Sequence, residues 1–211
     1  MEKLFGKTAL VTGASRGIGR ASALALAASG AQVLVHYGHG AAEANAVVSE
    51  IRNTGGRADA VAADLTAPDG PHKLARQVRS IIGDRLDILM ANAGVSKAAT
   101  IDETSVDDFD RLFAVNVRAP FFLVQQLLPI MHEGSSVVFV SSLAAHAVVG
   151  TIPAYAATKG AIETLVKHLA AALGQHGTDT VAVAHDQHPD HELGINRRPA
   201  NVAVKGRQLL A

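Results

Sequence analysis

The sequence contains no cysteine among its 211 residues. Disulfides, thiolate zinc sites and cysteine nucleophiles are therefore excluded, and the chain suits a reducing cytoplasm. Aromatic residues are scarce, at 4%, and small residues dominate, so we expect backbone to pack closely on backbone. An excess of charge is also lacking, because 19 basic residues cancel 19 acidic ones. We therefore expect neither nucleic acid nor a membrane as a partner.

Long apolar runs are missing too. The apolar part of MEKLFGKTALV is too short for a signal peptide, and the other apolar runs fall short of a membrane span. A hydrophobic share of 48% against 18% charged residues is typical of a compact globule. The length favours one domain with a substantial core, and we expect a cytoplasmic protein.

The chain alternates short β-rich runs with longer helical stretches. The predicted strands are 8–12, 31–37, 58–64, 86–92, 136–142 and 180–184. The predicted helices are 19–30, 41–55, 71–83, 105–131 and 153–177. The strands are almost continuously apolar, which indicates burial on both faces. This order predicts an α/β fold with a doubly wound parallel sheet, Rossmann-like, with helices on both faces and ligands at the carboxyl ends of its strands.

The stretch TGASRGIG, residues 12–19, directly follows the first predicted strand. Gly13 can form the tight turn, Gly17 lets the backbone approach a pyrophosphate, and Gly19 allows the helix to pack closely on the strand. The amides at the start of the helix then face the phosphates. A tight βα turn can use glycines without any ligand, but the strand before and the helix after favour a nucleotide site.

The choice of nucleotide depends on the end of the second strand. An acid there would hold a ribose 2′-hydroxyl, but this strand ends in HYGHG and the next carboxylate is Glu43. Arg16, within the glycine turn, could pair with an additional phosphate. The pattern predicts NADP rather than NAD. His36 or His39 could assist, although a surface histidine is the simpler interpretation of each.

A second group of polar residues follows the fifth predicted strand. Tyr155 and Lys159 are four residues apart, which places both on one face of a helix. A lysine ammonium beside a phenol favours the phenolate, and we expect it to lower the pKa of Tyr155. Ser142 ends a strand, where its hydroxyl could bind a substrate oxygen. Taken singly, Tyr155 and Lys159 are also typical of a solvated surface pair, and a serine at a strand end is typical of a capping residue.

Together these motifs resemble the short-chain dehydrogenase/reductase family, in its 3-oxoacyl-[acyl-carrier-protein] reductase-like branch, from about residue 4 to about residue 184. TGASRGIG is similar to the family's cofactor turn, and AADL, with Asp64, to the segment that contacts the adenine end. Asn92-Ala93-Gly94 resembles the element beside the nicotinamide ribose. FAVNV contributes Asn116, which resembles the family's water-holding asparagine.

The resemblance implies hydride transfer between a nicotinamide and a carbonyl or alcohol carbon. Tyr155 would exchange the proton, Lys159 would assist it and hold the ribose, Ser142 would orient the substrate oxygen, and Asn116 would link Lys159 to solvent. The implied cofactor-binding residues are Gly13, Ser15, Arg16, Gly17, Ile18, Gly19, Asp64, Leu65, Asn92, Ala93, Gly94, Tyr155 and Lys159. The family also implies a homo-oligomer, a dimer or tetramer, formed through the helices at 104–131 and 153–174.

The resemblance stops after residue 184. Where the family continues with Pro-Gly, this chain has His185-Asp186 and then a segment of different composition. We therefore expect a Rossmann-fold domain at 1–184 and an atypical tail at 185–211, with the family's last strand and substrate lid missing. The tail carries His185, His188 and His191, but Pro189 argues against a helix that would present them together, and we expect no metal site.

The sequence leaves two functions open. The first is an NADP-dependent reductase of a ketone or 3-oxoacyl group, favoured by the complete set of Ser142, Tyr155 and Lys159. The second is a catalytically impaired nucleotide-binding remnant, or a scaffold partner of full-length relatives, because a missing lid would leave the nicotinamide wet. A phosphotransferase is rejected, since no Lys-Ser/Thr pair closes the glycine turn.

Overall fold

The computed structural model describes residues 4–185. Its strands are β1 (Thr8–Val11), β2 (Gln32–Tyr37), β3 (Arg57–Ala62), β4 (Ile88–Ala91), β5 (Ser136–Ser142) and β6 (Asp179–His185). Its α-helices are α1 (Gly17–Ala28), α2 (Ala41–Asn53), α3 (Gly70–Ile82), α4 (Val106–Phe113), α5 (Ala119–Leu127) and α6 (Pro153–Gly174). The predicted strands and helices therefore all form. The remainder of the expected tail, residues 186–211 with His188 and His191, lies outside the described residues, and so does the expectation that the lid is missing.

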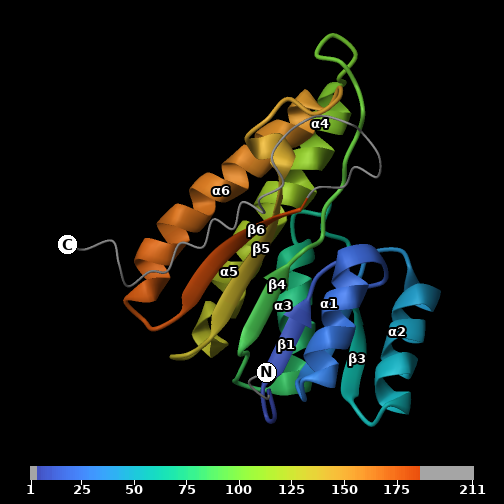
Figure 1. Ribbon diagram of the computed structural model, residues 1–211, viewed down its shortest axis with the longest axis vertical. Coiled ribbons are helices and arrows are strands. Elements are labelled where there is room, and N and C mark those ends of the chain that lie inside the picture. Colours follow the sequence, from blue (N-terminus) through green and yellow to red (C-terminus); the bar gives the residue numbers. More distant parts are fainter. Residues whose placement is uncertain (1–3, 186–211) are drawn as a thin grey trace, which may run out of the picture.

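The six strands form one parallel sheet in the order β3-β2-β1-β4-β5-β6 (Figure 1). The chain winds outward from β1 to β3, returns to the centre at β4 and then winds the other way. The carboxyl ends of β1 and β4 are therefore neighbours at the point where the winding reverses, which is where a doubly wound sheet opens a crevice. The predicted α/β doubly wound fold is confirmed.

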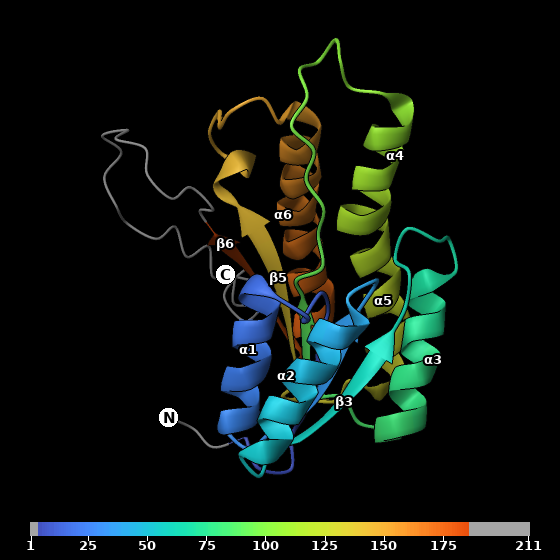
Figure 2. The ribbon, with the colours of Figure 1, turned by 90° about the vertical axis from the view of Figure 1, so that its right-hand side faces the viewer.

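Helices cover the two faces of the sheet unequally (Figures 1 and 2). On one face α1 and α2 pack on the first three strands, in a core of small residues such as Ala23, Ala27 and Val47. On the other face α3, α5 and α6 form a larger core around Phe139 and Leu123. Because alanines dominate the first core, α1 lies close to the sheet, and the turn before it is held near the strand ends.

The expectation that the strands are buried on both faces is correct only for part of the sheet. β1 and β2 are buried almost continuously, whereas β5 alternates between buried and half-buried residues. The reason is the unequal cover: within residues 4–185, α1 and α2 lie over β1, β2 and β3 but not over β5. Val138 and Val140 are consequently half-buried on that side.

The long helix predicted at 105–131 is divided. α4 is followed by a π-helical turn at Ala114–Arg118, then by α5 and a 3-10 turn at Leu128–Ile130. Contrary to the sequence-based expectation, the segment 106–130 is long and apolar enough to cross a membrane by length and composition alone. Of its most apolar stretch, 44% is buried inside the protein, and α5 packs on α3. α5 contributes Leu123 and Leu127 to the larger core.

Asp87 joins the amino ends of β1 and β4, at the opposite end of the sheet from the crevice. Its carboxylate accepts hydrogen bonds from the Thr8 amide at 3.0 Å, from Lys7 Nζ at 2.8 Å and from Arg85 at 2.8 Å. The side chain is 2% exposed, and that burial alone would raise its pKa. The hydrogen bonds from Arg85, Lys7 and Thr8 outweigh burial and hold the pKa of Asp87 at about 2.

We predict that Asp87→Ala lowers the free energy of unfolding by roughly 2–4 kcal/mol, because it leaves the Thr8 amide and two cations without their buried partner. Urea unfolding at pH 7 measures the loss. The substitution lies far from the crevice, so NADPH affinity of the folded variant should stay within about twofold of the parent chain, since no cofactor contact changes. Unchanged stability would contradict this account of Asp87.

Candidate active site

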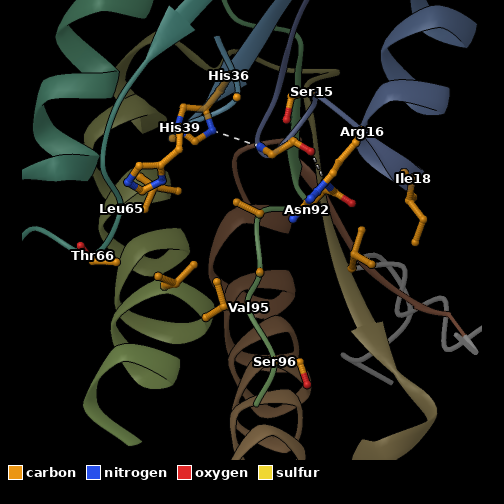
Figure 3. A pocket seen from close by; sticks show the side chains of 18 of the residues that line it. Ser15, Arg16, Ile18, His36, His39, Leu65, Thr66, Asn92, Val95 and Ser96 are labelled. Atoms are coloured by element: carbon orange, nitrogen blue, oxygen red, sulfur yellow. Dashed lines mark hydrogen bonds between the residues drawn. The ribbon is translucent and has the colours of Figure 1, made fainter. Parts of the chain in front are cut away.

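A cleft of about 730 Å³ opens at the carboxyl ends of the strands (Figure 3). Its walls come from the turn after β1, the ends of β2 and β3, the segment after β4, the end of β5 and the start of α6. Segments that are far apart in the sequence therefore meet in one hollow. The long loops after β4 and β5 rise at the same end of the molecule (Figure 2), where the Ala99 amide donates to the Thr151 carbonyl at 2.9 Å.

The glycines of the turn have separate geometric roles. Gly13 has φ +62°, and a Cβ on it would lie 2.9 Å from the Ala93 Cα. Gly19 has a normal φ but no room, because a Cβ would meet the Gly13 carbonyl oxygen at 2.4 Å. Gly17 has φ +57° and open space around it. These are the tight turn, the close packing and the open approach expected from the sequence.

Thr12 and Asn92 join the turn to the end of β4. The Thr12 hydroxyl accepts hydrogen bonds from the amides of Asn92 at 3.0 Å and Ala93 at 2.9 Å. The Asn92 side-chain amide donates to the carbonyls of Thr12 at 2.8 Å and Gly13 at 3.1 Å. Asn92 therefore holds the glycine turn in place in addition to lining the cleft.

His36 was interpreted from the sequence as a surface histidine, and this interpretation is wrong. The side chain is 2% exposed and lies behind the glycine turn, where its Nδ1 accepts the Gly13 amide at 3.1 Å (Figure 3). Nε2 lies 3.1 Å from the Ala63 carbonyl, so Nε2 carries the proton and the ring is neutral. Burial lowers its pKa to about 4, although the hydrogen bond to Ala63 opposes that shift.

Asn116 lies within the π-helical turn and is 3% exposed. Its Oδ1 accepts the Val95 amide at 2.9 Å, and its Nδ2 donates to the Val95 carbonyl at 2.9 Å and the Thr158 hydroxyl at 3.0 Å. The extra residue in a π turn rotates a side chain out of the α-helical pattern, and such turns are frequent at functional sites. Here the turn directs Asn116 toward the segment after β4 and toward α6.

Tyr155 and Lys159 lie one turn apart on α6, with the Lys159 Nζ 5.5 Å from the centre of the phenol ring. Nζ donates to the Val140 carbonyl at 2.8 Å, and burial lowers the pKa of Lys159 to about 8. The expected lowering of the Tyr155 pKa is not found: burial raises it, and the hydrogen bond with Ser142 only opposes that rise. The desolvation of the phenol outweighs that hydrogen bond.

Twelve of the thirteen predicted cofactor-binding residues, the two on α6 included, line one cleft. The cleft is lined by Gly13, Ser15, Arg16, Gly17, Ile18, Asp64, Leu65, Asn92, Ala93, Gly94, Tyr155 and Lys159. Gly19, Asn116 and Ser142 do not line the cleft themselves. Gly19 packs against the Gly13 carbonyl, Asn116 is buried, and Ser142 is next to Ser141, which lines the cleft. The carboxylate of Asp64 accepts the hydroxyl and amide of Thr66 at 2.7 and 2.9 Å, which lowers its pKa.

Gly19 is the one predicted cofactor-binding residue that does not line the cleft. His36, which the sequence indicated only as a residue that could assist, and Ser141, which it did not indicate, also line the cleft. The available signal for His36 was a histidine next to the last residue of an apolar strand, just before the loop. Nothing in the sequence marks Ser141 apart from its place beside Ser142.

The residues present fit a dinucleotide. Arg16 is the N-cap of α1, and its side chain forms no capping hydrogen bond, so no side chain occupies the first amides of the helix. A phosphate at that point would be bound by these amides and by the helix dipole. The open space at Gly17 and the exposed Arg16 adjoin the same point. A nicotinamide cofactor could therefore be held between the turn and α6.

Residues 7–185 match the short chain dehydrogenase family. The chain is 40% identical over 181 residues to the hydroxynaphthalene reductase arp2 of Aspergillus fumigatus, covering 86% of this chain and 66% of that protein. It is 40% identical over 185 residues to the versicolorin reductase stcU of Emericella nidulans, covering 86% and 69%. The chain thus spans about two thirds of the length of these relatives.

Among solved structures, the landomycin C-6 ketoreductase LanV with bound NADP and rabelomycin is similar, with a TM-score of 0.83 and 42% identity. The match covers 86% of this chain and 76% of that one. A short chain dehydrogenase from Burkholderia cenocepacia in complex with NADP gives a TM-score of 0.83 at 39% identity, covering 86% and 74%.

The buried neutral His36 should make stability depend on pH. Its pKa is about 4 when folded against 6.5 ordinarily, so the unfolded chain binds more protons between these values and stability falls as pH drops from 6.5 to 4. Between pH 7 and pH 5 the loss is about 2 kcal/mol. Urea unfolding at both pH values should show this loss, and His36→Asn, which does not titrate, should show a loss smaller by that amount. Equal losses in both proteins would contradict the burial of a neutral His36.

Proposed function

The chain belongs to the short-chain dehydrogenase family, and we propose that it is an NADP-dependent reductase that converts a ketone to an alcohol. One observation carries this proposal: Tyr155, Lys159 and the Ser142 segment adjoin the same cleft as the glycine turn and Arg16. A group that donates a proton and a site that holds a dinucleotide are therefore combined in one hollow. The NADP-bound structures of similar proteins support the choice of cofactor.

A nicotinamide cofactor held between the glycine turn and α6 would supply the hydride for the carbonyl carbon in the proposed reaction. Tyr155 donates its phenolic proton to the carbonyl oxygen, and the raised pKa of Tyr155 keeps that proton on the phenol until the oxygen becomes basic. Ser142, within reach of Tyr155, orients the same oxygen. Lys159 fixes the end of β5 through Val140 and presents its amine toward the cleft.

We propose a ketone on a fused, hydroxylated aromatic ring system as the substrate class. The names of the relatives, hydroxynaphthalene reductase and versicolorin reductase, support this class. A 3-oxoacyl group is the second candidate, and the mostly apolar composition of the loop 143–152 is compatible with either group. We further propose a cytoplasmic homo-oligomer formed through α4, α5 and α6, supported by the exposed Val106, Phe109 and Phe121 on the first two helices.

Arg16 should determine the preference for NADPH. We predict that the chain binds NADPH about tenfold or more tightly than NADH, because a guanidinium and a phosphate form a charge-assisted pair. Arg16→Ala should weaken NADPH about tenfold and leave NADH unchanged. Titration by nucleotide fluorescence measures both constants, and Arg20→Ala, one turn further along α1, is the control. Equal weakening of both nucleotides would contradict the proposed phosphate contact.

Tyr155 should be required for reduction but not for cofactor binding. Tyr155→Phe removes only the phenolic hydroxyl, so we expect turnover of an aromatic ketone to fall by roughly 100-fold or more, with NADPH affinity within about threefold of the parent chain. NADPH oxidation at 340 nm measures turnover. A parent chain that binds NADPH yet reduces no ketone would favour the nucleotide-binding remnant over the reductase.

A further inference from the structure

Glu163 lies on α6, one turn beyond Lys159 and two turns beyond Tyr155. All three side chains therefore share one face of the helix. Its carboxylate is 14% exposed, and each of its oxygens has a partner. Oε1 accepts the Ser141 hydroxyl at 2.8 Å, and Oε2 lies 2.8 Å from the His146 Nε2.

These two partners are on either side of Ser142. Ser141 precedes it at the end of β5 and is 3% exposed, whereas His146 follows it after a 3-10 turn at Leu143–Ala145. The Ser142 hydroxyl accepts the Ala144 amide at 3.2 Å and so caps that turn. One carboxylate on α6 thus holds both flanks of the segment that carries Ser142.

We propose that Glu163 is a positioning residue for reduction: it fixes Ser142 opposite Tyr155 by holding Ser141 and His146 on α6. The inference rests on the proposed function, because Ser142 orients the substrate oxygen there. Without Glu163 the buried Ser141 hydroxyl loses its acceptor, and the His146 side of the segment is released. Ser142 then loses its fixed position relative to the phenol, while the glycine turn, on the other side of the cleft, keeps all its contacts.

The test compares Glu163→Ala and Glu163→Gln with the parent chain. Gln keeps an acceptor for Ser141 and should retain most of the activity. For Glu163→Ala we expect kcat/KM for an aromatic ketone to fall about 10- to 100-fold, with NADPH affinity within about twofold. Asp59→Ala, which removes a carboxylate paired with Arg52 outside the cleft, is the matched control and should behave as the parent chain does.

Amide hydrogen exchange gives a readout that needs no activity. In Glu163→Ala the amides of Ala144, His146 and Ala147, which are hydrogen-bonded within the segment, should exchange about tenfold faster or more, while those of α1 keep their rates. Unchanged exchange in this segment would overturn the proposal. So would an unchanged kcat/KM, or a loss of NADPH affinity as large as the loss of kcat/KM.

The two proposals fail in different ways. A parent chain that binds NADPH and reduces no ketone overturns the proposed function and, with it, the catalytic part of this inference. The exchange measurement then still decides whether Glu163 orders the Ser142 segment. A parent chain that reduces ketones, with a Glu163→Ala variant that does so equally well, overturns the role of Glu163 alone.

Discussion

The backbone of Gly13 lies against Ala93 so closely that a Cβ on Gly13 would be 2.9 Å from the Ala93 Cα. This approach brings the turn after β1 onto the end of β4, at the point where the winding of the sheet reverses. Gly19 contributes to the same packing, because without a Cβ the start of α1 can lie directly against the Gly13 carbonyl. The position of α1, and of the free amides at its start, follows from this packing.

Hydrogen bonds then hold the glycine turn in the position that this packing sets. Asn92 binds the turn from the side of β4, and His36 binds it from the side of β2. His36 can accept the Gly13 amide only while its Nδ1 is unprotonated, and burial ensures this by lowering its pKa. The turn is therefore held by neighbours on both sides, each of which contributes a neutral group and adds no charge near the proposed phosphate site.

Much of this arrangement could be predicted from the sequence, because it depends on local patterns. Apolar runs gave the strands, glycine spacing gave the turn, and a spacing of four placed Tyr155 and Lys159 on one helical face. The failures depend on contacts between distant segments. His36 binds Ala63, just after β3, and the raised pKa of Tyr155 comes from its burial. Asn116, in the π turn, binds Val95 and Thr158.

The two halves of the cleft are built differently. The half that fits the cofactor rests on backbone packing, where no side chain larger than hydrogen can replace Gly13 or Gly19. The half beside Tyr155 rests on side chains of α6, each holding one part of the segment after β5: Lys159 holds Val140, and Glu163 holds Ser141 and His146. Because the contacts of α6 come from single side chains, a substitution at Lys159 or Glu163 can change the segment after β5 while the backbone contact between Gly13 and Ala93 stays in place.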